Sequence, residues 1–170
     1  MNPGEEAELV RRAARDDLAA FAALVREHEA PLRRYLARLA GQDGDDLAQE
    51  TLLAAWRAIG QWRGEGSFGG WLRTIATRRF LDLRRKRRLR TQPLNTVDEP
   101  AHDDGTEQRV AIDRALSRLP DRERAAALLL FAHGHSHGEA AAILGMPLGT
   151  MKSIAARARA ALIPLLDGAD

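Results

Sequence analysis

The sequence predicts an all-α protein, with two small helical domains joined by a flexible acidic linker and a helix-turn-helix in the C-terminal domain. Hydrophobic residues make up 45% of the 170 residues but aromatic residues only 5%, which is typical of helices packed through Ala and Leu. Apolar residues recur at helical spacing, and strand signals are nearly absent. Residues 91–108 shift abruptly to Pro, Asn, Asp and Glu, so we expect this segment to link the two domains.

Five helices are expected before the linker. The second has Leu18, Phe21 and Val25 on one face, and Pro31 is expected to open the third. Acidic residues near Asp45 favour the start of the fourth because they complement its dipole. A loop from Gly60 to Gly70 separates the fourth helix from the fifth. The expected ranges are 5–14, 17–28, 31–39, about 45–59 and 71–90.

Glycines divide the C-terminal domain into short helices. Gly134 and Gly138 end one apolar run, and Gly145 with Pro147 ends the next before a helix at 148–162. Two helices joined by so short a turn must cross steeply, which predicts a helix-turn-helix. One stripe of the second helix is apolar: Met151, Ile154, Ala155, Ala158, Leu162 and Leu165. The opposite face holds Lys152, Ser153, Ala156, Arg157 and Ala160.

The face opposite the apolar stripe is suited to duplex DNA. Its small side chains allow a close approach, so Lys152 and Arg157 can reach phosphates or base edges in a major groove. Gly149 and Thr150 place free N–H groups at the helix N-terminus. The alternative is an ordinary amphipathic hairpin with a solvated basic face.

The helix expected at 71–90 is the second basic element. It carries nine Arg or Lys residues and a single acid, Asp82, although the net charge of the whole chain is only +2. Such a density repels itself unless a polyanion neutralises it. Its predicted buried face is Leu72, Ile75, Ala76, Phe80 and Leu83, and its predicted exposed stripe is Thr74, Thr77, Leu81, Arg84, Arg85 and Arg88. A solvated charged helix is the alternative, which the second basic element disfavours.

An aromatic cluster precedes this helix. Trp62, Phe68 and Trp71 lie in or beside the glycine-interrupted loop, and such clusters hold unstacked bases of single-stranded nucleic acid. The alternative is that Phe68 and Trp71 are core anchors. In that case Trp62 is the one ring of the three that lies near a base. Arg63, Ser67 and the loop backbone then contribute more to base binding than the aromatic rings do.

Composition excludes several classes of protein. The chain has no cysteine, so it has no disulfide and no thiolate metal site. No apolar stretch is long enough to span a bilayer, and the charged segment 1–15 lacks a signal-peptide core. We therefore expect a soluble cytoplasmic protein.

Several motifs occur together in a fixed order along the chain. They are Asp46-Leu-Ala-Gln-Glu-Thr51, Phe68-Gly-Gly-Trp-Leu72, Leu119-Pro120, Glu139-Ala-Ala141 and Pro147-Leu-Gly-Thr-Met-Lys-Ser153. With the arginine run and the acidic linker, they resemble the extracytoplasmic-function (ECF) sigma factors, group 4 of the sigma-70 family. The resemblance covers about residues 21–166.

This resemblance implies a bacterial transcription initiation factor that binds core RNA polymerase, directs it to promoter DNA and opens that DNA. It implies no catalysis, and neither a cofactor nor a bound metal is expected. Residues 1–90 would bind polymerase and recognise and melt the minus-ten element. Residues 91–109 would be the linker, and 110–170 would read the minus-thirty-five element. Family members are often held inactive by an anti-sigma factor, so such a protein is a candidate third partner.

The resemblance also assigns site residues by position. The polymerase-binding face would be Asp46, Gln49, Glu50, Leu53 and Arg57. The minus-ten element, with a flipped base, would be taken by Arg63, Ser67, Thr74, Thr77, Arg78, Arg84, Arg85 and Arg88. The minus-thirty-five element would be read by Gly149, Thr150, Lys152, Ser153, Arg157 and Arg159. The chain has Arg78 where the family commonly has Asn and Ile154 where it commonly has Arg, so the promoter sequence does not follow.

Two other functions compete with this interpretation. His133, His135 and His137 alternate ahead of Glu139, and in an extended segment such an array could bind zinc or nickel as a metal sensor. A helix end and a turn fall there, however, so the rings need not converge. The second alternative is a repressor that uses the C-terminal helix-turn-helix alone and binds DNA tightly without polymerase.

Overall fold

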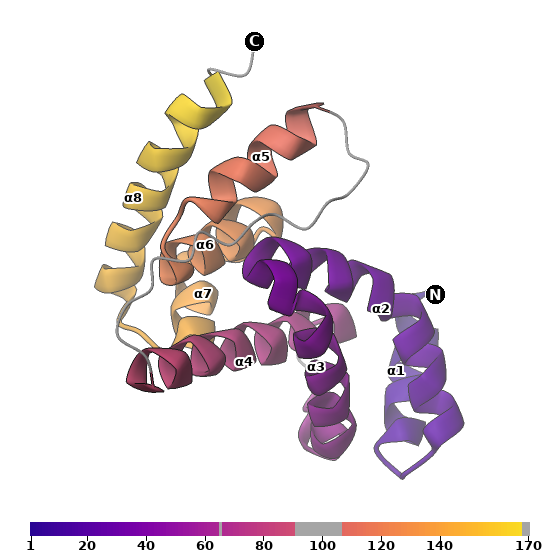
Figure 1. The fold of residues 1–170 in the computed structure, drawn as a ribbon. Coiled ribbons are helices and arrows are strands. Elements are labelled where there is room, and N and C mark those ends of the chain that lie inside the picture. The colour runs from indigo at the N-terminus through magenta and orange to yellow at the C-terminus, as the bar shows by residue number, and fades with distance from the viewer. Residues whose placement is uncertain (65, 91–106, 168–170) are drawn as a thin grey trace.

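The computed structural model describes residues 1–64, 66–90 and 107–167, which form helices and turns with no strand among them (Figure 1). The all-α prediction is confirmed. Residues 91–106, most of the predicted linker, lie outside the described residues. Within the described ranges, no helix is long and apolar enough to cross a membrane.

The N-terminal half is built around a long central helix that contacts the other three. Polar side chains cap its first two helices: Asn2 accepts the N–H of Glu5, and Asp17 accepts the N–H of Ala20. Its elements are α1 (Pro3–Ala13), α2 (Leu18–Ala40), the 3₁₀ turn η1 (Gly41–Asp43), α3 (Gly44–Ala58), the 3₁₀ turn η2 (Ile59–Gln61) and α4 (Phe68–Arg90). The last helix begins three residues before its predicted start.

The central helix α2 corrects one prediction. Pro31 was expected to open a new helix, but α2 runs through it without interruption. An internal proline removes one hydrogen bond and costs about 3 kcal/mol. Here Leu24 precedes it and Leu32 and Leu36 follow it on one buried face, so their shared packing offsets that cost.

The C-terminal half consists of shorter helices. Its elements are α5 (Glu107–Ser117), α6 (Asp121–Ala127), the π-turn η3 (Leu128–Ala132), α7 (His137–Leu144) and α8 (Leu148–Asp167). Helix α5 begins inside the predicted linker range of 91–109. The predicted helix-turn-helix is present as α7 and α8. Gly145 between them adopts a left-handed conformation with φ of 61°, which suits glycine because it has no side chain.

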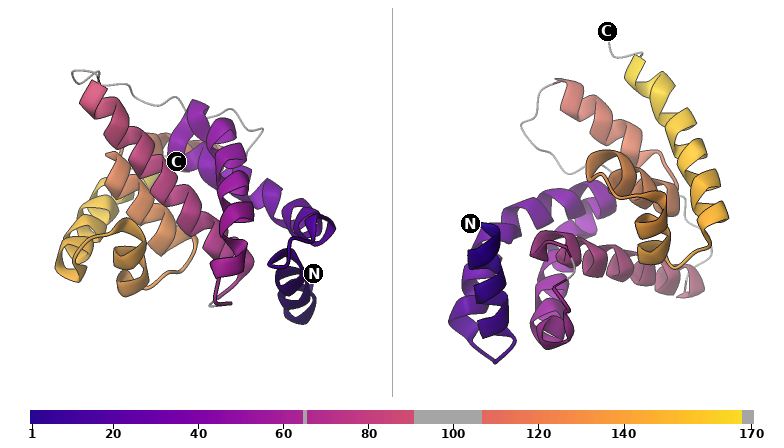
Figure 2. Two further views of the ribbon diagram at one scale, coloured as in Figure 1. Left: turned by 90° about the horizontal axis from the view of Figure 1, so that it is seen from below. Right: turned by 180° about the vertical axis from the view of Figure 1, so that it is seen from behind.

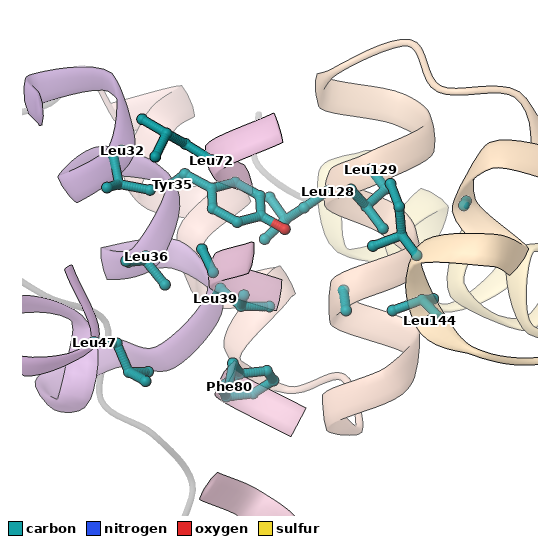
Figure 3. Packing of buried hydrophobic residues seen from close by; sticks show 14 of the residues in the cluster. Leu32, Tyr35, Leu36, Leu39, Leu47, Leu72, Phe80, Leu128, Leu129 and Leu144 are labelled. Carbon is teal, nitrogen blue, oxygen red and sulfur yellow. The ribbon is translucent and has the colours of Figure 1, made fainter. Parts of the chain in front are cut away.

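The two halves share one hydrophobic core (Figure 3). Tyr35 and Leu39 of α2 face Leu128 and Leu129 of η3 across the interface, and all four are buried. In Figure 2, the helices of the C-terminal half lie against α2 and α4. The flexible linker predicted from the sequence would let the halves move until a partner fixes them, but in the structure they pack together, because each supplies apolar surface that the other covers.

Polar contacts also join the halves. Arg38 of α2 pairs with Asp113 of α5 at 2.8 Å. Arg124 of α6 is only 4% exposed, and its guanidinium donates to the carbonyl of Leu39 at 3.0 Å and to that of Leu119 at 3.2 Å. A single buried cation therefore satisfies carbonyls near the ends of helices from both halves.

Candidate nucleic-acid and protein interfaces

One side of α3 is an exposed stripe available to a large partner. All five residues predicted to bind polymerase are exposed: Asp46, Gln49, Glu50, Leu53 and Arg57. The opposite side buries Leu47, Ala48 and Ala55 against α2 and α4. Leu53 is 58% exposed, so the stripe offers one large apolar side chain among its polar and charged groups.

The loop between η2 and α4 is held by its aromatic residues. Phe68 is fully buried, and Trp62 stacks on Trp71 with ring centroids 5.5 Å apart. Phe68 and Trp71 are therefore anchors, as the second of the two sequence interpretations holds. Arg63 and Ser67 are exposed beside them, so the loop presents polar groups and backbone to a ligand.

Thr77 does not lie where the sequence placed it. It is fully buried, and its hydroxyl donates to the carbonyl of Arg73 and lies 2.6 Å from the hydroxyl of Tyr35. Burial raises the pKa of Tyr35 to about 12 despite the opposing effect of this hydrogen bond. Thr77 therefore braces α4 against α2 and cannot touch DNA in this arrangement.

Several arginines of α4 contact the C-terminal half. Arg84 lies 3.5 Å from Asp121 at the start of α6, and Arg88 approaches the same carboxylate at 3.5 Å. The Arg84 side chain is only 11% exposed and lies over the ring of Phe80. Nε of Arg78 donates to the carbonyl of Ile143 at 3.4 Å. Of these three arginines, Arg84 is thus covered, whereas Arg78 and Arg88 remain exposed.

The remaining minus-ten residues have different surroundings. Arg85 is 72% exposed beside Asp82, while the hydroxyl of the half-buried Thr74 donates to the carbonyl of Gly70. A groove of about 700 Å³ lies between α4 and α7, lined by Arg78, Leu81, Asp82, Arg85, Arg88, Leu89, Arg122, Ala142, Ile143, Leu144 and Gly145. Its arginines make it cationic.

Helix α8 presents the face that the sequence predicts. The residues predicted to read the minus-thirty-five element are all exposed: Gly149, Thr150, Lys152, Ser153, Arg157 and Arg159. Met151, Ile154 and Ala158 are buried, so the absence of a cation at Ile154 matches its place in the core. Nε of Arg157 donates to Glu123 of α6 at 2.8 Å.

The histidine array has other contacts. The His133 ring lies against Tyr35 at 5.3 Å, and Glu139 accepts the backbone N–H of Ser136 as part of the cap of α7. Among the described residues, no group of three or more His, Asp or Glu side chains is arranged to hold a metal ion. Desolvation, followed by the charge of Arg73, lowers the pKa of His133 to about 4.

This lowered pKa predicts a loss of stability in acid. The folded chain favours the neutral ring, so the contribution of His133 is complete above its ordinary pKa of 6.5 and is lost as the pH falls through about 4. The melting temperature should fall over that window, and less so in His133→Asn. His137→Asn, at the first residue of α7, is the control; both histidines are exposed, but the His133 ring also packs against Tyr35. Identical pH profiles for the two variants would contradict the assignment.

The sequence analysis did not identify Tyr35, Asp121 or Glu123 as residues of these surfaces. Each contacts a predicted site residue that is far away along the chain: Tyr35 contacts Thr77, Asp121 contacts Arg84, and Glu123 contacts Arg157. No local pattern marks them, because an acidic residue at a helix start such as Asp121 is ordinary capping chemistry.

Two family models match the chain. Sigma-70 region 2 matches residues 24–90, and Sigma-70, region 4 matches residues 109–162. The ECF RNA polymerase sigma factor SigM of Mycobacterium tuberculosis is 39% identical over 169 residues, which span 95% of this chain and 84% of SigM. The RNA polymerase sigma factor CnrH of Cupriavidus metallidurans is 34% identical, over 98% of this chain and 97% of CnrH.

Solved structures agree with this match. The sigma factor RpoE of Bartonella quintana, in complex with the anti-sigma factor NepR, aligns with a TM-score of 0.71 at 30% identity, over 87% of this chain and 97% of RpoE. CnrH in complex with the cytosolic domain of CnrY aligns with a TM-score of 0.65 at 28% identity, over 96% and 97% of the two chains.

The fold and the two family regions define a promoter-recognition subunit of bacterial RNA polymerase. Within that class, the chain belongs to the ECF sigma factors of the sigma-70 family. It binds core RNA polymerase and promoter DNA and directs transcription initiation, without enzymatic activity of its own. The repressor and the metal sensor are set aside, because both family regions are present in order.

Proposed function

We propose that three surfaces divide the work of this sigma factor. The exposed stripe of α3 docks on core polymerase, the loop before α4 and the arginines of α4 take the minus-ten element, and α8 reads the minus-thirty-five element. Residues 1–90, 91–109 and 110–170 are the corresponding domains and linker. The observation that carries this proposal is the exposed face of α8, where cations lie opposite the buried Met151, Ile154, Ala155 and Ala158.

The minus-ten surface has two parts: a row of arginines on α4 that binds DNA phosphates, and a loop that binds a flipped base. Arg78, Arg84, Arg85 and Arg88 line one side of α4, and cations so placed follow a DNA backbone. The loop offers Arg63 and Ser67 beside the stacked Trp62 and Trp71. Polar groups next to a rigid aromatic platform suit a flipped non-template base.

The packed halves give a reason for the order of assembly. The polymerase face on α3 is exposed, whereas Arg84 and Arg88 face Asp121, and Arg157 faces Glu123. A carboxylate takes the place that a DNA phosphate would occupy beside each cation. The chain therefore docks on polymerase first, and separation of the halves then frees Arg84 and Arg88 from Asp121. The face of α8 is already exposed, and DNA has only to displace Glu123 of the same half from Arg157.

Neutralising those two carboxylates should strengthen DNA binding by the free chain. Asp121→Asn with Glu123→Gln removes ion pairs worth at most about 1 kcal/mol each, so the affinity should rise about two- to tenfold. Fluorescence anisotropy with labelled duplex DNA measures it. Asp16→Asn with Glu27→Gln, which changes the charge equally on exposed residues of the other half, is the control. Equal gains in both variants would show a general charge effect instead.

An anti-sigma factor is the proposed regulator. RpoE and CnrH, which resemble this chain over most of its length, were each solved with a partner, and NepR is named as an anti-sigma factor. We propose that such a protein binds this chain while its halves are packed together, and that the chain works in the cytoplasm, where polymerase acts.

The test is reconstitution with core polymerase. Purified chain and core enzyme, given a genomic fragment library, should produce discrete run-off transcripts, and the transcripts would also define the promoter. Failure of the chain to co-migrate with core enzyme, once any bound inhibitor is removed, would refute the proposal.

Asp46→Arg should weaken that association. Asp46 lies on the exposed stripe, so reversing its charge opposes docking and should lower the affinity for core at least about tenfold. Asp45→Arg is the control, because it lies one residue earlier in the same helical turn but off the stripe. Native gels with core enzyme measure both, and equal losses would place the effect in the helix rather than in the docking face.

A further inference from the structure

A carboxylate of α1 reaches across to the start of α4. Oε1 of Glu6 accepts the backbone N–H of Phe68 at 2.9 Å, and its Oε2 lies 3.0 Å from Nε2 of His28 on α2. The Glu6 side chain is 19% exposed and that of His28 is 17% exposed. Both hydrogen bonds are thus largely sheltered from water.

These contacts serve the first turn of α4. A helix begins with backbone N–H groups that have no partner inside the helix. Ser67 accepts the N–H of Gly70, and Glu6 supplies the acceptor for Phe68 from a different helix. The negative charge also complements the positive end of the helix dipole. The start of α4 is therefore fixed to α1 as well as capped locally.

His28 holds the carboxylate in place. Its ring packs against the ring of Phe68 with centroids 5.3 Å apart. A Cβ atom at Gly69 would lie only 3.0 Å from Nδ1 of His28, so α4 begins in close contact with this ring. Glu6, His28 and Phe68 thus make one packed unit, which joins three helices.

Phe68 directly follows Ser67, one of the exposed polar residues of the loop. We propose that Glu6, oriented by His28, is a positioning residue that sets the loop for recognition of the minus-ten element. Helix α1, which lies outside the matched range of 24–90, thereby contributes to promoter specificity. The inference rests on the proposed function, in which Arg63 and Ser67 meet the minus-ten element.

The experiment uses holoenzyme made with the full chain and a promoter fragment selected by run-off transcription, together with its single-base minus-ten variants. Open-complex formation on each fragment is followed by permanganate reactivity. Glu6→Ala should slow opening about tenfold or more, because a largely sheltered charged acceptor is removed, and should reduce the discrimination between minus-ten bases. Association with polymerase should remain normal.

Glu6→Gln separates positioning from charge. Its amide oxygen can still accept from Phe68, and its N–H₂ can donate to Nε2 of His28 in the tautomer that carries its proton on Nδ1, so discrimination should be largely restored. Glu8→Ala, on the same helix and paired with exposed Arg11, is the matched control and should behave normally. Equal loss in the Gln and Ala variants would overturn the proposal, as would a parallel loss of polymerase association in Glu6→Ala.

A loop variant keeps the two proposals apart. Arg63→Ala, which leaves the Ser67 cap of α4 in place, should lose minus-ten discrimination if the loop reads that element. If this variant discriminates normally, the assignment of the loop is wrong. If it loses discrimination while Glu6→Ala keeps it, the loop assignment stands and only the role of Glu6 is refuted.

Discussion

Replacing Lys152 and Arg157 together with alanine should lower closed-complex affinity by about thirtyfold or more. Each good contact to a base edge is worth about 1–3 kcal/mol, and both side chains stand on the exposed face of α8. The fold should survive, because the opposite stripe with Met151 and Ile154 is unchanged. Footprinting of the holoenzyme measures the effect, which should appear as a loss of protection upstream.

The matched control removes two other cations from the same half. Arg114 and Arg118 are exposed and lie outside the proposed reading face. Arg114→Ala with Arg118→Ala changes the net charge equally, so it accounts for long-range attraction to DNA. An upstream footprint that is unchanged in the Lys152 and Arg157 variant, or reduced equally in the control, would contradict the role of α8.

The sequence was sufficient for α8 because one rule decides its orientation. Apolar residues at helical spacing must be buried, and this places Met151, Ile154 and Ala158 in the core and Lys152 and Arg157 outside. The polymerase stripe on α3 follows the same rule. Both helices pack against an ordinary apolar core. The spacing of apolar residues within each helix is therefore enough to predict which side chains are buried and which are exposed.

The same reasoning failed where the position of a side chain depends on contacts with residues far away in the sequence. Thr77 is small and polar, so the wheel put it outside, but the hydroxyl of Tyr35 gives it a buried partner. Pro31 was expected to begin a helix, but packing on both sides of it keeps α2 whole. The pairing of Arg84 with Asp121 depends on how the two halves meet, which no helical period encodes.

Ion pairs with other elements also explain why a nearly neutral chain can hold so basic a helix. Asp43 of η1 pairs with Arg87, and Asp121 faces Arg84 and Arg88. Acidic residues from elsewhere in the fold thus offset the self-repulsion of α4 when no polyanion is present. DNA has to replace these carboxylates, so the cost of breaking their ion pairs offsets part of the attraction between α4 and phosphate.

Arg84→Ala with Arg88→Ala should slow promoter opening strongly while leaving polymerase association intact. Each phosphate contact contributes about 0.9 to the slope of log affinity against log salt, so the slope should fall by about 1.8. Affinity measured between about 50 and 200 mM salt gives the slope, and permanganate reactivity gives the opening. Arg15→Ala with Arg26→Ala, both exposed on the N-terminal half, is the control of equal charge. An equal loss of core binding in the Arg84 and Arg88 variant, or an unchanged slope, would show that these arginines hold the halves together without meeting DNA.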